Sequence, residues 1–240
     1  MTVPAIEFRE VTVRYEDPGP SVLEGVSLAV RSRERVALVG RNGSGKTTLL
    51  KAAVGLVPHR GEIRVFGERL SGRSLAGIRR RIGFLFNVPE DQLLFPTPEE
   101  DVAFGLIRRG WSPPEALGRA REVLGDLGVG TLAGSPIHHL SHGEKQRVAL
   151  AGSLVTGPEL LLLDEPSASL DPPGRRSLAL LLEGLDTAIM VATHDLEFAG
   201  RFCTRFLVLD GGRVGIDTGD VGEVARWWAD RMPGDHRGAI

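Results

Sequence analysis

The sequence predicts an α/β fold in which short apolar strands alternate with helices, with an all-helical part inserted into the chain. A strand, a glycine-rich loop and a helix follow one another over residues 36–54. A fully apolar strand at residues 160–163 ends in two carboxylates. Between these two features, helix-start signals recur over residues 97–144, which predicts the helical part. A chain of 240 residues is long enough to bury a large core without disulfides.

Composition limits the classes of function that the chain can have. Its formal net charge is −2, with acidic and basic residues mixed, which argues against a nucleic-acid partner. The single cysteine, Cys203, has no partner for an internal disulfide and suits a reducing compartment. No apolar run approaches the ~20 residues needed to span a bilayer, and Met1 to Glu10 lacks a signal-peptide core. We therefore expect a cytosolic protein that touches a membrane only through a partner.

Two strands are expected at the N-terminus. Alternating apolar residues predict a strand from Ile6 to Tyr15, and a turn at Asp17–Pro20 leads into a second strand at Val22–Val30. Tyr15 is the only tyrosine in the chain. Its position alone favours ordinary strand packing over an aromatic surface for adenine.

The next segment has the pattern of a phosphate-binding loop. The apolar strand Val36–Val39 and the helix Thr48–Val54 flank the loop Gly40-Arg41-Asn42-Gly43-Ser44-Gly45-Lys46-Thr47. Glycines let successive backbone N–H groups face phosphate oxygens, and the following helix directs its positive dipole end at the anion. The Lys46 ammonium reaches the β- and γ-phosphates, and the Thr47 hydroxyl is a ligand for Mg²⁺. Lysine occurs at only three positions in this arginine-rich chain, so Lys46 is informative.

A run of shorter elements leads into the helical part. We expect, in order, a strand at 61–66, a helix at 74–81, a strand at 82–86, a loop at 87–96, helices at about 98–108 and 113–127, and a loop at 128–139. The two helices begin at Thr97-Pro98 and Ser112-Pro113, each with a glutamate at the third helical position. A third capping box, Ser141 to Glu144, opens a helix to about Thr156. The cap pattern alone is compatible with a helix start and no further role.

Two carboxylates follow the apolar strand Leu160–Leu163. Charged groups directly after a buried strand are uncommon unless they have a function. In a protein with a phosphate loop, an aspartate in the position of Asp164 holds Mg²⁺, and Glu165 is then placed to polarise a water molecule.

The remaining elements complete the alternation of strands and helices. A helix begins at Asp171-Pro172, and a strand at 188–193 ends before His194, a position where histidine is more often structural than catalytic. A hairpin at 206–209 and 214–217, an amphipathic helix at 222–231 and a frayed tail at 233–240 follow.

The order of these motifs resembles that of the ABC ATPases, the nucleotide-binding subunits of ABC transporters. The resemblance covers about residues 6–217 and includes the phosphate loop, Leu140–Glu144, Leu163–Pro166, Ser169–Asp171 and Thr193–Asp195. It implies a P-loop NTPase fold of ABC type, with a mixed central sheet flanked by helices and an antiparallel β part. It further implies one domain over residues 1–232, with a helical subdomain at about 88–156.

The resemblance also assigns roles to single residues. Tyr15 matches the adenine-stacking aromatic, Asp164 the residue associated with Mg²⁺, Glu165 the general base and His194 the γ-phosphate switch. The residues from Gly40 to Thr48 match the site that binds ATP in the same chain. Ser141, His142, Gly143 and Glu144 match the signature motif, which contacts the ATP of a second subunit, and Asp171 belongs to the adjoining motif. Two chains, identical or different, would then enclose two ATP molecules head to tail.

Two positions depart from the family pattern. His142 stands where the second signature residue is usually glycine, although Ser141 and Gly143 remain. Asn87 stands where the family has a glutamine that contacts Mg²⁺ and the lytic water. We expect Asn87 to keep a weakened form of this role, for which Gln92 is a poorer substitute.

The stretch Phe86–Gly105 resembles the ATPases of energy-coupling-factor and cobalt/nickel importers. The resemblance implies three partners: a second ATPase subunit, a transmembrane scaffold and a membrane protein that captures a metal cation or vitamin. A peripheral location on the cytoplasmic face of the membrane is implied as well. The alternatives are a soluble ABC ATPase of DNA repair or translation and an unrelated phosphate-loop kinase or GTPase. The single phosphate loop and the lack of a heptad stretch favour the importer.

Overall fold

Two β-sheets form the body of the molecule in this computed structural model, which describes residues 3–16 and 18–231. The central six-stranded sheet has the order β10-β9-β3-β8-β7-β6 and is parallel except for β10, which pairs antiparallel with β9. Its strands are β3 (Arg35–Val39), β6 (Ile82–Leu85), β7 (Leu160–Asp164), β8 (Ala188–Thr193), β9 (Arg205–Asp210) and β10 (Arg213–Thr218). Strands β7 and β8 are buried along their whole length, which explains their unbroken apolar sequences.

The second sheet is antiparallel, with the order β2-β1-β4-β5. Its strands are β1 (Ile6–Val13), β2 (Leu23–Val30), β4 (Arg60–Val65) and β5 (Glu68–Arg69). Strand β1 ends before Tyr15, whose side chain is 60% exposed, so the expected packing of Tyr15 within a strand is wrong. The two-residue strand β5 was not expected, because it is too short to show an alternating pattern.

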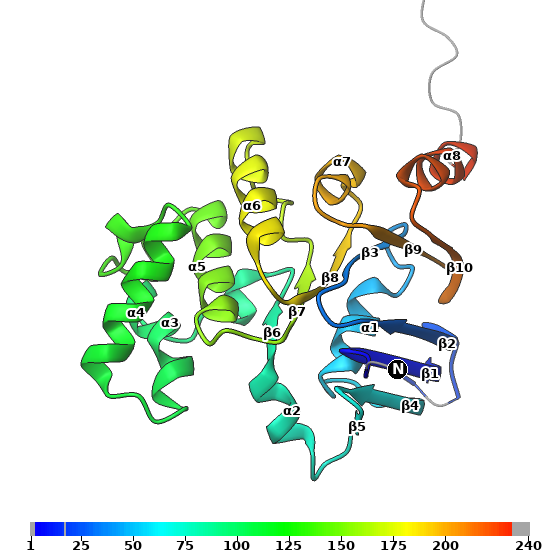
Figure 1. The fold of residues 1–240 in the computed structure, drawn as a ribbon, viewed down its shortest axis with the longest axis horizontal. Coiled ribbons are helices and arrows are strands. Elements are labelled where there is room, and N and C mark those ends of the chain that lie inside the picture. The colour runs from blue at the N-terminus through cyan, green and yellow to red at the C-terminus, as the bar shows by residue number, and fades with distance from the viewer. Residues whose placement is uncertain (1–2, 17, 232–240) are drawn as a thin grey trace, which may run out of the picture.

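Three helices form a part of their own at one end of the molecule (Figure 1). They are α3 (Pro98–Ile107), α4 (Pro113–Asp126) and α5 (His142–Leu154), and they share a separate hydrophobic cluster. The capping boxes at Ser112 and Ser141 are both formed. Short 3₁₀ helices lie within the expected loops: η1 (Pro89–Asp91), η2 (Gly130–Leu132) and η3 (Ile137–His139).

The other helices pack on the two sheets. They are α1 (Lys46–Ala53), α2 (Leu75–Arg81), α6 (Pro172–Gly184), α7 (Leu196–Gly200) and α8 (Val221–Arg231). Helix α7 was not expected, because five residues are too few to show helical periodicity. No helix within residues 3–16 and 18–231 is long and apolar enough to cross a membrane. The expected frayed tail, 233–240, lies outside the described residues.

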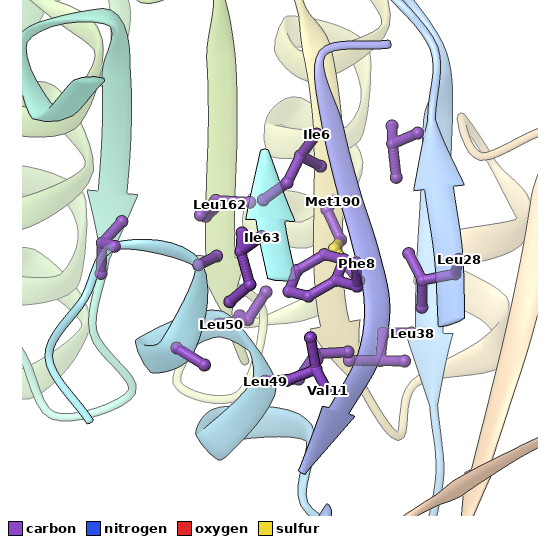
Figure 2. Packing of buried hydrophobic residues seen from close by; sticks show 14 of the residues in the cluster. Ile6, Phe8, Val11, Leu28, Leu38, Leu49, Leu50, Ile63, Leu162 and Met190 are labelled. Carbon is purple, nitrogen blue, oxygen red and sulfur yellow. The ribbon is translucent and has the colours of Figure 1, made fainter. Parts of the chain in front are cut away.

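Helix α1 packs between the antiparallel sheet and the central sheet. Figure 2 shows Phe8 of β1, Leu50 of α1 and Met190 of β8 in one cluster, and all three side chains are buried. This packing fixes α1, and with it the loop that precedes α1, against the central sheet. The mixed central sheet, the antiparallel sheet and the helical part confirm the predicted fold class.

The contribution of this cluster can be measured by truncating Phe8, which is 1% exposed. We expect Phe8→Ala to lower the free energy of unfolding by about 3–5 kcal/mol, because it removes buried apolar area and leaves a cavity. Leu180→Ala is the matched control, since Leu180 is 68% exposed. Denaturant unfolding of both variants measures the difference, and similar midpoints would contradict the prediction.

Candidate functional site

The carboxyl ends of three neighbouring parallel strands meet at one edge of the central sheet. Val39 of β3 pairs with Thr193 of β8, and Asp164 of β7 pairs with Ala192 of β8. The glycine-rich loop after β3, Glu165 after β7 and His194 after β8 therefore leave the sheet at the same level. In open α/β sheets, ligands bind at this edge.

A cavity of about 450 Å³ opens at this edge. Its volume lies within the range of about 300–1,000 Å³ that is usual for small-molecule sites. It is lined by Val22, Asn42, Gly43, Ser44, Gly45, Lys46, Thr47, Thr48, Asn87, Glu165, Ala168 and His194. Most of the residues that the sequence singled out are thus brought together, from four separate segments of the chain.

The loop requires glycine at two of its positions. Gly45 has a φ of 104°, and a Cβ there would lie 2.7 Å from Leu23 Cδ2. A Cβ on Gly40 would lie 2.4 Å from the carbonyl oxygen of Leu209. Gly45 is also the N-cap of α1, and no side chain caps this helix end. The first backbone N–H groups of α1 therefore remain available to an anion in the cavity.

Lys46 places a cation inside the loop. Its side chain is 7% exposed, and its Nζ donates to the carbonyl oxygens of Gly40 at 2.8 Å and Arg41 at 3.3 Å. Burial lowers the pKa of Lys46, while the charges of Glu165 and Asp164 oppose this shift. Gly40 and Arg41 do not line the cavity themselves but hold the ammonium in position through their carbonyl groups.

Asp164 and Thr47 offer oxygen atoms suited to a hard cation. Asp164 is 2% exposed, and its Oδ1 has no hydrogen-bond partner among the described residues. Burial raises the pKa of Asp164, and the Thr47 hydroxyl partly offsets the shift. No group of three or more His, Cys, Asp or Glu residues suited to a metal occurs in the part of the chain that the structure describes. Two protein oxygens together with phosphate oxygens are a typical Mg²⁺ environment, so the residues fit this ion.

Glu165 has a strained backbone conformation and a carboxylate that its neighbours fix. Its φ of 51° is unusual for a residue with a side chain. Its Oε2 accepts a hydrogen bond from Thr193 Oγ1 at 3.2 Å and lies 3.0 Å from His194 Nδ1. The side chain is 11% exposed. One oxygen of this carboxylate is therefore fixed at the cavity wall by two residues that follow one another in the chain.

Thr193 was not among the expected site residues. The signal was present, because Thr193 directly precedes His194 at the end of the buried strand β8. Its hydroxyl also accepts from the backbone N–H of Asp195 at 3.0 Å. Thr193 is thus a hydrogen-bonding link between the ends of β7 and β8.

Asn87 lies at the cavity, and Tyr15 lies beside it. Asn87 is one of the lining residues. Tyr15 is not, but its hydroxyl lies 3.0 Å from Thr48 Oγ1, so its ring is adjacent to the start of α1. Gln92 points elsewhere, because its Oε1 accepts from Phe86 N at 3.2 Å and its Nε2 donates to Ala149 O at 2.8 Å.

The remaining expected residues lie outside this cavity. Ser141, His142, Gly143 and Glu144 form the start of α5, where Ser141 Oγ accepts from Glu144 N at 3.4 Å. Asp171 caps α6 by accepting from Gly174 N at 3.0 Å. It lines a different cavity of about 400 Å³, together with residues of α5 and α6. The helix end at 141–144 is thus a second potential anion site, which the same chain does not place in the first cavity.

Sequence comparisons point to one family. Residues 23–168 match the family described as ABC transporter. A provisionally named ABC transporter ATP-binding protein of Streptomyces avermitilis is 41% identical over 225 residues, covering 93% of this chain and 85% of that protein. A similar protein of Gloeobacter violaceus is 49% identical over 212 residues, covering 87% and 86%. The energy-coupling factor transporter ATP-binding protein EcfA2 of Methanospirillum hungatei is 37% identical, and the match covers 88% of this chain and 54% of that protein.

The solved structures that resemble this chain are also ABC transporter ATP-binding proteins. CbiO1 of Clostridium perfringens, part of the ABC transporter complex cbiONQ, superposes with a TM-score of 0.79 at 32% identity and covers 96% of both chains. The ATP-binding cassette MJ0796, solved as a dimer in a post-hydrolysis state with ADP and Pi, superposes with a TM-score of 0.81 at 31% identity. That match covers 89% of this chain and 98% of the other.

The contribution of the Lys46 ammonium to phosphate binding can be tested by nucleotide titration. Lys46→Ala removes the one cation that lines the cavity among the described residues. We expect the affinity for ATP to fall about 10- to 100-fold, because a charge-assisted hydrogen bond to phosphate contributes about 1.5–3 kcal/mol. Lys51→Ala is the control, since Lys51 lies on the same helix but does not line the cavity. Equal losses in the two variants would contradict this assignment.

Proposed function

Because this chain belongs to the ABC transporter family of ATP-binding proteins, we propose that it powers an importer of the energy-coupling-factor type. The chain is an ABC ATPase, which hydrolyses ATP to power transport. The observation that supports the position of the ATP site is the cavity at the carboxyl edge of β3, β7 and β8. The cargo of such an importer, a metal cation or a vitamin, is captured by a separate membrane protein.

The segment after β6 supports the importer type. Asp101 at the start of α3 accepts hydrogen bonds from Leu94 N at 2.7 Å and Phe95 N at 3.1 Å, which holds this segment against the helical part. Leu94 is 76% exposed, and Ile107 and Trp111 are also exposed. Exposed apolar side chains in this part of the chain suit contact with a partner protein. The chain is similar to EcfA2, whose name places it in an energy-coupling factor transporter, and to CbiO1, which is part of the ABC transporter complex cbiONQ.

The geometry suggests a division of roles in hydrolysis. The N–H groups of the loop and of α1, together with Lys46, would bind the β- and γ-phosphates. Thr47 and Asp164 would hold Mg²⁺, which when bound supplies positive charge to the phosphates, and Asn87, which lines the cavity, would assist. Glu165 would accept a proton from the attacking water while His194 contacts the γ-phosphate. The fixed Oε2 of Glu165 leaves its other oxygen for that water.

The chain would work as a dimer that encloses two ATP molecules. The anion site at Ser141–Glu144 does not line the ATP cavity of its own chain, so it is available to the nucleotide of a partner. The MJ0796 cassette is dimeric, which supports this arrangement. The second subunit is either another copy or a related ATPase, and the pair would bind a transmembrane scaffold on the cytoplasmic face of the membrane. Tyr15 would stack on adenine, and Asp171 would lie near the dimer contact.

The role of Glu165 as general base predicts a separation of binding from turnover. Glu165→Gln keeps the size of the side chain and one acceptor oxygen but removes its basicity. We expect ATP to bind, the closed dimer to accumulate and turnover to fall at least about 100-fold, as for loss of a general base. Phosphate release and size-exclusion chromatography with ATP measure the two effects. Turnover near that of the native chain would show that another group activates the water.

The importer assignment predicts which proteins accompany the chain in the cell. Affinity purification of the tagged chain from its native membranes in mild detergent should recover a transmembrane scaffold and a substrate-capturing membrane protein. Mass spectrometry would identify them and would show whether a second ATPase is present. Recovery of only nucleic acid or translation factors would replace the importer by the soluble ABC ATPase of repair or translation.

A further inference from the structure

One carboxylate links the loop at the ATP cavity to the first turn of α5. Glu90 Oε1 accepts a hydrogen bond from Lys145 Nζ at 3.0 Å and lies 3.7 Å from Nδ1 of His142. The Lys145 side chain is 18% exposed and that of Glu90 is 46% exposed. The hydrogen bond from Lys145 lowers the pKa of Glu90, so the carboxylate is ionised at neutral pH.

Glu90 belongs to a segment that begins at the ATP cavity. It lies in η1, three residues after Asn87, which lines the cavity. Gln92 binds the same segment to a later turn of α5, because its amide bridges Phe86 N and Ala149 O. Residues 86–92 are therefore attached to α5 at two points along the helix, one at its start and one near its middle.

Glu144, the acidic residue in the first turn of α5, does not compete with Glu90 for Lys145. Glu144 accepts hydrogen bonds from the backbone N–H of Ser141 and from its hydroxyl, both at 2.7 Å. Glu144 therefore completes the capping box of α5, and Glu90 is left as the hydrogen-bond acceptor for Lys145 among the described residues.

We infer that Glu90 is a positioning residue that couples the two ATP sites of the dimer. Asn87 at one end of the segment faces the chain's own ATP, and the start of α5 at the other end faces the ATP of the partner. A displacement of the segment at the first nucleotide is thereby transmitted to the helix end that binds the second. His142, which replaces the usual glycine, adds a second side chain to this link. The inference rests on the proposed two-ATP dimer.

The expected effect of losing the link is modest but measurable. A partly exposed ion pair contributes little by itself, but each dimer contains two copies of this one. In the Glu165→Gln background, Glu90→Gln should raise the ATP concentration for half-maximal dimerisation about two- to tenfold. The affinity for ADP, measured on the monomer, should stay within about twofold, because Glu90 does not line the cavity.

The control and a double-mutant cycle distinguish coupling from a general loss of structure. Glu122→Gln removes another exposed ion pair of the helical part, with Arg119, and should leave the ATP requirement unchanged. Adding Lys145→Gln to Glu90→Gln should cause little further change if the two residues act as one pair. Fully additive effects, an unchanged ATP requirement in Glu90→Gln, or an equal loss of ADP affinity would overturn the inference. Failure of the Glu165→Gln chain itself to dimerise with ATP would instead refute the proposed dimer of two copies of this chain.

Discussion

The parallel register of β3, β7 and β8 is the constraint on which the site depends. The functional groups of β7 and β8 lie at the last residue of each strand and at the residue after it, and the glycine-rich loop begins directly after β3, so a one-residue slip would displace these groups. The register is in turn fixed by burial on both faces, since β7 and β8 are buried throughout. The long apolar runs of the sequence are therefore as necessary to the chemistry as the polar residues that follow them.

The same edge also carries features that are unfavourable for folding. Asp164 Oδ1 and Ser44 Oγ are buried without hydrogen-bond partners among the described residues, and Glu165 has a positive φ. Each of these features costs about 1–3 kcal/mol when nothing compensates it. Their presence in one place is explained if phosphate and Mg²⁺ supply the missing partners. The burial of apolar side chains around α1, between the two sheets, offsets the unfavourable free energy of these features.

Local patterns predicted the loop, the buried strands and the helix caps, because each depends on residues that are close in the sequence. The chain therefore revealed Lys46, Asp164 and Glu165 before the fold was known. The sequence could not reveal the order of strands in the antiparallel sheet, which depends on long-range pairing, or the short elements β5 and α7. The contact of Gln92 with Ala149 was hidden for the same reason, since it joins residues 57 positions apart in the chain.

The division of the anion-binding groups between two places has a mechanical consequence. One chain carries a phosphate loop at the sheet edge and, at the start of α5, a capped helix end that does not line the cavity at that edge among the described residues. A ligand that contacts both must join two chains, and its binding energy then stabilises their association. Because α5 belongs to the helical part, which carries the exposed Leu94 and Trp111, that association also positions the surface proposed for the membrane partner. In the proposed dimer, loss of the γ-phosphate would remove the shared ligand and release both contacts together.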